Sequence, residues 1–165
     1  LCQKDTDARW MTKSGEKHFG FKDHINADEK TKLITKYSVT SAAPHDSTEI
    51  ENIVDETDNR LHGESTYRSK EIEKHLKAIE CEKKKKKKGY RGSPLTEQQK
   101  ESNNKKSKIR ARVEHIFGFM TNSMNNALYM RSIGIKRIKE SIGLLNLTYN
   151  LFRFEQLIRL EKVKI

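Results

Sequence analysis

Cysteine is scarce in this chain, and several familiar site motifs are missing. The two cysteines, Cys2 and Cys81, are too few for a disulfide framework or a four-cysteine zinc site. No apolar run approaches the roughly 20 residues that a membrane span needs, and no cationic segment followed by an apolar run opens the chain. Gly89 and Gly92 lack the spacing of a phosphate-binding loop, and the Gly-x-Ser-x-Gly turn of serine hydrolases does not occur. We therefore expect a protein of a reducing cytoplasm with no membrane partner.

Size and composition limit the fold to one modest domain. The chain has 165 residues, of which 33 % are hydrophobic and 35 % are charged. These proportions allow a single small core and leave the rest of the chain polar. Patterned polar sequence begins immediately after Leu1, so we expect the chain to be a fragment of a longer protein.

The positive charge is concentrated in one segment. Residues 83–112 contain thirteen basic side chains and two acidic ones, and the remaining residues have a net charge of zero. Such a segment attracts a polyanion through phosphate contacts and counterion release, although a solvated lysine-rich loop explains the run Lys83–Lys88 equally well. The later basic residues are the stronger evidence for DNA binding, because a helical pattern aims their side chains. These residues are Lys105, Lys106, Lys108, Arg110 and Arg112.

The first half of the sequence has the pattern of an α/β protein. Residues 18–27 and 33–42 each suit a strand, and the polar residues between them predict a β-hairpin. A short helix capped by Asp46 or Ser47 should follow, and residues 69–79 have helical spacing of apolar residues. The expected sheet is mixed, and its first two strands pair antiparallel.

The last third of the sequence is predicted to be helical. Thr96 and Gln99 have the spacing of a capping box at the start of a helix. Residues 122–126 interrupt the helical pattern, and the final helix has a broad apolar side. We expect the following apolar side chains to lie in the core: Trp10, Phe19, Phe21, Leu144, Leu145, Leu147, Leu151 and Phe152. In this division of a single domain, residues 1–92 form the α/β part with its basic loop, and residues 93–165 form the helical part.

One carboxylate stands out among the basic residues. Glu114 follows Arg110 by four residues at the edge of the apolar stripe. An i, i+4 ion pair between the two explains this spacing and stabilises a helix by about 0.2–0.5 kcal/mol. A ligand for Mg²⁺, with the neighbouring basic side chains holding phosphates, explains it as well.

Several short motifs, in order along the chain, resemble those of one protein family. They are Gln3-Lys4-Asp5-Thr6-Asp7-Ala8-Arg9-Trp10, His18-Phe19-Gly20-Phe21-Lys22, Val39-Thr40 with His45-Asp46-Ser47, Ser65-Thr66-Tyr67-Arg68-Ser69, Ser107 to Gly118, and Asn146-Leu147-Thr148-Tyr149-Asn150. Together they are similar to the C-terminal part of bacterial insertion-sequence transposases of the DDE type. The resemblance implies a ribonuclease-H-like fold. It also implies that three acids hold two Mg²⁺ ions, which activate water or a 3′-hydroxyl for DNA strand cleavage and strand transfer.

The resemblance assigns catalytic and metal-ligand positions to two glutamates. The family's Arg-x-x-x-Glu pattern matches Arg110 and Glu114, and Glu64 occupies the place where the family has its second Asp. The first Asp belongs to a strand that precedes the Gln-Lys-Asp motif, so we expect the sheet to lack its first strand. Thr121 replaces a basic residue of the family. Glu64 is longer than the Asp that it replaces, so its carboxylate is displaced, and the first Asp is missing. These two changes predict that this chain is inactive on its own.

Other functions remain open at this point. A non-catalytic DNA-binding module acting through residues 83–112 is the main alternative; it predicts that Glu114→Gln spares DNA binding. RNA binding would instead depend on Lys83–Lys88, and membrane-surface binding has little support. The resemblance implies that the partner is DNA at insertion-sequence ends, close to the bacterial nucleoid, and leaves open whether two copies pair.

Overall fold

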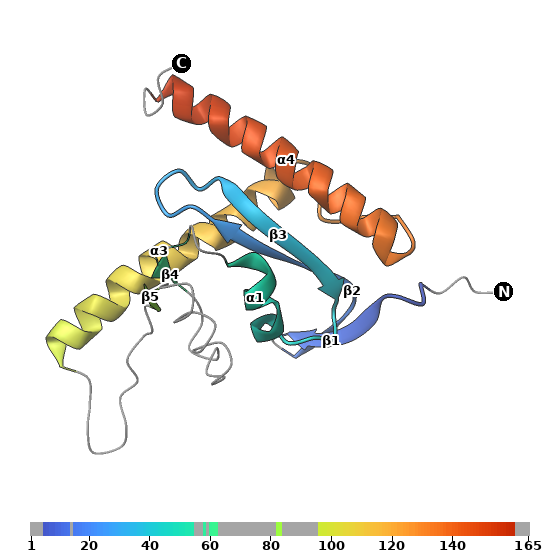
Figure 1. Ribbon diagram of the computed structural model, residues 1–165, viewed down its shortest axis with the longest axis horizontal. Helices are drawn as coiled ribbons and strands as arrows, with labels where there is room; N and C mark the ends of the chain where they lie inside the picture. Colours follow the sequence, from blue (N-terminus) through green and yellow to red (C-terminus); the bar gives the residue numbers. More distant parts are fainter. Residues whose placement is uncertain are drawn as a thin grey trace.

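The computed structural model describes residues 5–13, 15–54, 58, 60–62, 82–83 and 96–160. Within these residues it shows a small antiparallel sheet, a separate pair of very short strands and two long helices (Figure 1). Glu64, the predicted helix 69–79 and most of the lysine run lie outside the described residues.

The predicted hairpin is confirmed, and it is extended by a strand that the sequence pattern did not indicate. Strand β2 (Glu16–Ala27) pairs antiparallel with β3 (Ile34–Ser41), and the additional strand β1 (Arg9–Lys13) pairs antiparallel with the first residues of β2. The Asp28 carboxylate closes the β2–β3 turn by accepting hydrogen bonds from the Lys30 and Thr31 amides at 3.1 and 2.6 Å. Lys32 in this turn has a positive φ of 61°.

The second short sheet is parallel. Strand β4 (Arg60–Leu61) pairs with β5 (Glu82–Lys83), so the lysine run begins in a strand. Between β3 and β4 lie a 3-10 turn (Asp46–Glu49) and the one-turn helix α1 (Ile50–Ile53). The N-cap of α1 is Glu49, with no capping hydrogen bond from its side chain, so the predicted cap at Asp46 or Ser47 is wrong.

The two long helices begin and end close to where the sequence predicts. Helix α3 (Glu97–Asn122) starts with the predicted capping box, in which the Gln99 amide donates to Thr96 Oγ1 and the Thr96 amide donates to Gln99 Oε1. Asn125 and Asn126 adopt positive φ values after the helix, which end the helical path. Helix α4 (Ile135–Arg159) then returns along β3 (Figure 1). Within the described residues, neither helix is apolar enough over a bilayer's length to cross a membrane.

The core lies between the β2–β3 hairpin and the two helices. One cluster joins β3, α3 and α4 through Ile34, Ile116, Met120, Leu145 and Tyr149. A second cluster joins β3 and α4 through Val39, Ile138 and Ile142. Ile116 and Met120 are almost completely buried, so the predicted apolar stripe of α3 is confirmed at these positions.

Several apolar side chains predicted in the core are on the surface. On α4 only Leu145 of the five predicted residues is buried; the other four (Leu144, Leu147, Leu151 and Phe152) are exposed. A helix turns through about 100° per residue, so one face meets the sheet and these residues lie off that face. Trp10 and Phe19 are also exposed, and their ring centroids lie 5.2 Å apart. They stay on the surface because β1 contacts mainly its neighbour β2 and is not covered by a helix.

Candidate functional site

The predicted DNA-binding side chains all lie on α3. The first half of this helix projects away from the β2–β3 hairpin (Figure 1). Lys105 and Lys108 are exposed there, whereas Lys106, Arg110 and Arg112 are half-buried. The first half of α3 therefore protrudes from the described sheet and carries part of the positive charge in exposed side chains.

The two acidic residues near the start of α3 pair with lysines at its surface. Glu97 lies 2.7 Å from Lys100, and Glu101 lies 2.8 Å from Lys105. The hydrogen bond from Lys105 lowers the pKa of Glu101, and the same bond raises the pKa of Lys105. Exposed pairs of this kind contribute little stability, so these pairs do not fix the lysine side chains in place.

Arg112 has a structural partner. Its guanidinium donates to the carbonyl oxygen of Glu29, which ties α3 to the β2–β3 turn. His62 lies 3.7 Å from the Glu29 carboxylate on the same side. Arg110 and Arg112 line a cavity of about 600 Å³ between α3, the end of β2 and β4. The cavity wall also contains the acidic residues Asp28, Glu29 and Asp58. Arg112 therefore holds the helix in place through its contact with Glu29.

Glu114 is exposed on α3, one helical turn after Arg110. Its position at the edge of the apolar stripe of α3 therefore does not bury the side chain. Its proposed partner Glu64 lies outside the described residues. Within the described part of the chain, no three His, Cys, Asp or Glu side chains gather where they could hold a metal ion. A single exposed carboxylate does not fit a two-metal site.

Asp5 and Asp7, from the first of the family-like motifs, have a structural role. The Asp5 carboxylate accepts from the Gly134 amide at 2.9 Å, and the Asp7 carboxylate accepts from the Ile135 amide at 2.9 Å. These amides belong to the N-terminus of α4, which carries partial positive charge and has no cap from its own residues. The bond from Gly134 lowers the pKa of Asp5. The motif thus fastens the start of the chain to α4.

Tyr149 and Asn150, from the last of the family-like motifs, also hold the fold together. The Asn150 side chain accepts from the Ile34 amide and donates to the Ile34 carbonyl, both at 2.8 Å. Tyr149 donates its hydroxyl to the Lys32 carbonyl at 3.1 Å. The amide of Asn150 therefore acts like an additional strand residue against β3, and it sets the position of α4 on the sheet.

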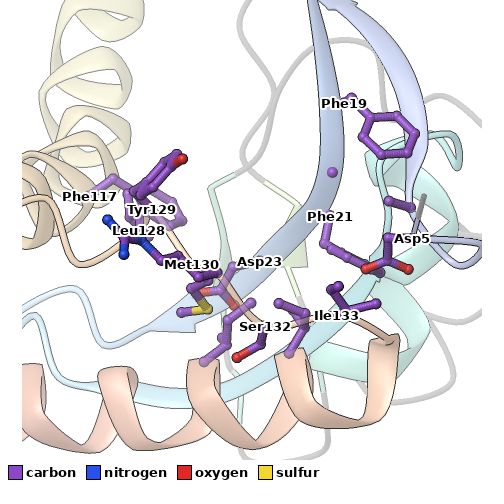
Figure 2. Close-up of a pocket in the computed structure, with 15 residues that line it drawn as sticks. Asp5, Phe19, Phe21, Asp23, Phe117, Leu128, Tyr129, Met130, Ser132 and Ile133 are labelled. Atoms are coloured by element: carbon purple, nitrogen blue, oxygen red, sulfur yellow. The ribbon is translucent and has the colours of Figure 1, made fainter. Parts of the chain in front are cut away.

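A buried acid that the sequence interpretation did not select lies on the helix-facing side of β2. Asp23 lines a cavity of about 570 Å³ together with Phe21 and Met130 (Figure 2). Both of its carboxylate oxygens are buried and lack a hydrogen-bond partner among the described residues, as do the side-chain N and O of Asn146. Burial raises the pKa of Asp23 to about 7, and the Asn146 amide offsets part of that rise. The strand alternation contained the signal, because Asp23 shares the parity of Phe21 and Ile25.

Comparison with known proteins identifies the family. A family model described as "Transposase DDE domain" matches residues 1–151. The transposase for insertion sequence element IS1106 of Neisseria meningitidis serogroup B is 32 % identical over 117 residues. That match covers 70 % of this chain and 40 % of the relative, so the chain spans less than half of the relative's length. No solved structure matches the chain. The motifs from Asp5 to Asn150, the family model and the relative together show that the chain belongs to the transposases with a DDE domain.

Proposed function

We propose that this chain is the DNA-holding part of an insertion-sequence transposase and that it does not cut DNA by itself. The observation that carries the proposal is the protruding, basic first half of α3, which leads along the same helix to Glu114. Lys105 and Lys108 would hold backbone phosphates by charge-assisted hydrogen bonds. The reaction class of the complete protein would be DNA strand cleavage and joining at insertion-sequence ends, in the bacterial cytoplasm.

We also propose that the complete domain has a ribonuclease-H-like fold. Among the described residues, β2 has only β3 as a strand neighbour along residues 21–27, and β4 pairs only with β5. The cavity of about 600 Å³ is lined by Ile25 and Ala27 of β2 and by Leu61 of β4. A ribonuclease-H-like sheet has a strand in this place, which would join the antiparallel and parallel pairs into one mixed sheet.

The proposed lack of activity rests on the carboxylates. Catalysis with Mg²⁺ needs several acidic ligands around one small site, and among the described residues no three metal-binding side chains gather around Glu114. Glu114 and Glu64 are proposed as inherited metal-ligand positions. If Glu114 still binds metal, Mn²⁺ raises the melting temperature of the chain and leaves that of Glu114→Gln unchanged. If Mn²⁺ leaves the melting temperature of both proteins unchanged, the result favours the non-catalytic DNA-binding module.

DNA binding is tested by its salt dependence. The double variant Lys105→Ala/Lys108→Ala should weaken binding to duplex DNA and reduce the slope of log K against log salt by about 1.8, since each phosphate contact contributes about 0.9. The matched control is Lys136→Ala/Arg137→Ala, which removes two exposed basic side chains from α4. Fluorescence anisotropy at several salt concentrations measures both slopes. Equal slopes for the two double variants would show that α3 is not the DNA-binding surface.

A further inference from the structure

A small pocket lies where the β2–β3 turn meets α3 and α4. Its volume is about 170 Å³. Cavities that enclose a drug-sized molecule hold roughly 300–1,000 Å³, so this pocket is too small for a nucleoside and suits one small ion. We call it the Arg153 pocket, and six residues line it: Lys32, His115, Phe119, Tyr149, Arg153 and Gln156.

The Arg153 pocket is positively charged. Among the described residues, its lining contains three basic side chains and no acidic one. The acidic groups closest in sequence have other partners. Glu155 lies 3.6 Å from Arg159, and the Asp28 carboxylate accepts hydrogen bonds from the amides of its own turn. The positive charge of the lining is therefore not balanced by a carboxylate in the pocket, and it favours an anion there.

Arg153 is the residue that points most clearly to a ligand. Its side chain is half-buried; Nε donates to the Thr31 carbonyl at 2.6 Å, and Nη1 donates to Gln156 Oε1 at 3.1 Å. A guanidinium has five N–H donors, so three of them have no partner among the described residues. The two bonds fix the plane of the group, and the remaining donors form the fork that binds phosphate oxygens. A charge that is partly removed from water in this way normally has a counter-ion.

The rest of the lining supplies further donors. The Gln156 side-chain amide carries two N–H groups in addition to the oxygen that Arg153 contacts. His115 is exposed and has no hydrogen bond or ion pair with a described residue, and its imidazole offers an N–H donor in either protonation state. Lys32 adds a positive charge from the turn. The rings of Phe119 and Tyr149 form the apolar part of the wall, which strengthens the attraction for an anion.

We propose that the Arg153 pocket binds a phosphate group of the DNA backbone. The inference rests on the proposed DNA-holding function and adds a second contact point to it. His115 lies seven residues after Lys108 on α3, which places both on the same side of the helix, about 10 Å apart along its axis. One strand of DNA advances about 3.4 Å per nucleotide, so a strand held by Lys108 presents another phosphate about three nucleotides farther on.

Thermal melting with inorganic phosphate tests the pocket without DNA. At a concentration ten times the dissociation constant, phosphate should raise the melting temperature of the parent by about 3–6 °C beyond its effect on the variants. Phosphate also stabilises proteins by exclusion from their surface, and this effect is common to all of them and cancels. The first variant is Arg153→Gln. The second is Lys32→Asn/His115→Ala, which keeps the bonds of Arg153, and Asn tolerates the positive φ of Lys32.

Each melting shift is measured against the same protein without phosphate, so any loss of the Thr31 bond in Arg153→Gln cancels. The matched control is Lys17→Asn/His18→Ala, which removes one lysine and one histidine from exposed positions on β2. This control should respond to phosphate as the parent does. Circular dichroism checks that every variant is folded.

Fluorescence anisotropy with duplex DNA tests the source of the phosphate. Lys32→Asn/His115→Ala should reduce the slope of log K against log salt by about 0.9, since one phosphate contact is lost. At a fixed salt concentration the dissociation constant should rise about tenfold. If the melting shift depends on the pocket and the slope does not change, the pocket takes a free phosphate ion, and its assignment to DNA is wrong.

One result would overturn the site itself. If phosphate raises the melting temperature of the parent, both pocket variants and the control equally, the Arg153 pocket binds no phosphate. Failure of the proposed function has a different signature. A parent chain that does not bind DNA at any salt concentration refutes the DNA-holding role and the assignment of the pocket to DNA, whereas the melting shifts still decide whether the pocket binds phosphate.

Discussion

The buried carboxyl group of Asp23 should make the protein less stable as the pH rises. Asp23 lies on β2 between two apolar side chains of the same face, and its carboxylate oxygens have no hydrogen-bond partner among the described residues. Burial raises its pKa from 3.8 to about 7. An ionised carboxylate in this position loses hydration, and the Asn146 amide compensates only part of that loss, so the folded protein favours the protonated form.

The sign and the size of the effect follow from linkage. Between pH 3.8 and about 7 the unfolded chain has lost the proton of Asp23, while the folded chain still holds it. The folded state therefore binds more protons in this window, and the free energy of unfolding falls as the pH rises. One pKa unit corresponds to about 1.36 kcal/mol. The loss is complete above about pH 7 and amounts to about 4 kcal/mol for the shift of Asp23.

The substitution Asp23→Asn removes the ionisation and keeps the shape of the side chain. Near pH 8 the variant should be more stable than the parent by about 4 kcal/mol, which raises the melting temperature by about 8–16 °C. Near pH 4 the parent carboxyl is neutral, and the two proteins should agree within about 1 kcal/mol. Urea unfolding followed by circular dichroism across this pH range gives the two stability curves. Other titrating groups are common to both proteins and cancel in the difference.

The exposed Glu51 on α1 provides the control, because Glu51→Gln removes a carboxylate that remains in water. This variant should follow the parent at every pH. If Asp23→Asn differs from the parent by the same amount at pH 4 and at pH 8, the carboxylate is not destabilised by burial, and the reasoning fails.

Two further predictions concern the contacts that hold α4. Asn150→Ala leaves the buried amide and carbonyl of Ile34 without their partners and should lower the free energy of unfolding by about 2–4 kcal/mol, measured by urea unfolding. Asn104→Ala on the exposed side of α3 is its control and should change stability by less than about 0.5 kcal/mol. The Gly134 amide lowers the pKa of Asp5, so its stabilising effect is complete above pH 3.8 and is lost as the pH falls further. Thermal melting should therefore show a smaller loss of stability in acid for Asp5→Asn than for the parent, and equal losses would contradict this role.

Patterns over a few residues predicted the elements well because local contacts decide them. The β2–β3 hairpin depends on the alternation of its strands and on the Asp28 turn, which closes through neighbours in the sequence. The start of α3 depends on Thr96 and Gln99, which are three residues apart. Strand β1 escaped prediction because its Trp10 is exposed and contacts Phe19 of β2 on the surface, so β1 has no apolar face directed at the core.

The candidate site was only partly visible in the sequence. The basic residues of α3 and the position of Glu114 follow from the pattern and from the family motifs, and the family itself was predicted correctly. The exposure of Glu114 and the contact of Arg112 with the β2–β3 turn depend on how α3 lies against the sheet. A metal or DNA contact depends on such placement, so the assigned roles of these residues stay predictions.

The sequence by itself determined the family, the hairpin, the two long helices and the segment that carries the excess charge. Only the tertiary structure decided which of the two apolar faces of α4 is buried, because both faces satisfy the helical period equally well. It also brought Asp5 to Gly134 across 129 positions and buried Asp23 beside Asn146. These outcomes depend on contacts between distant segments, whose geometry is set by packing and which no local pattern encodes.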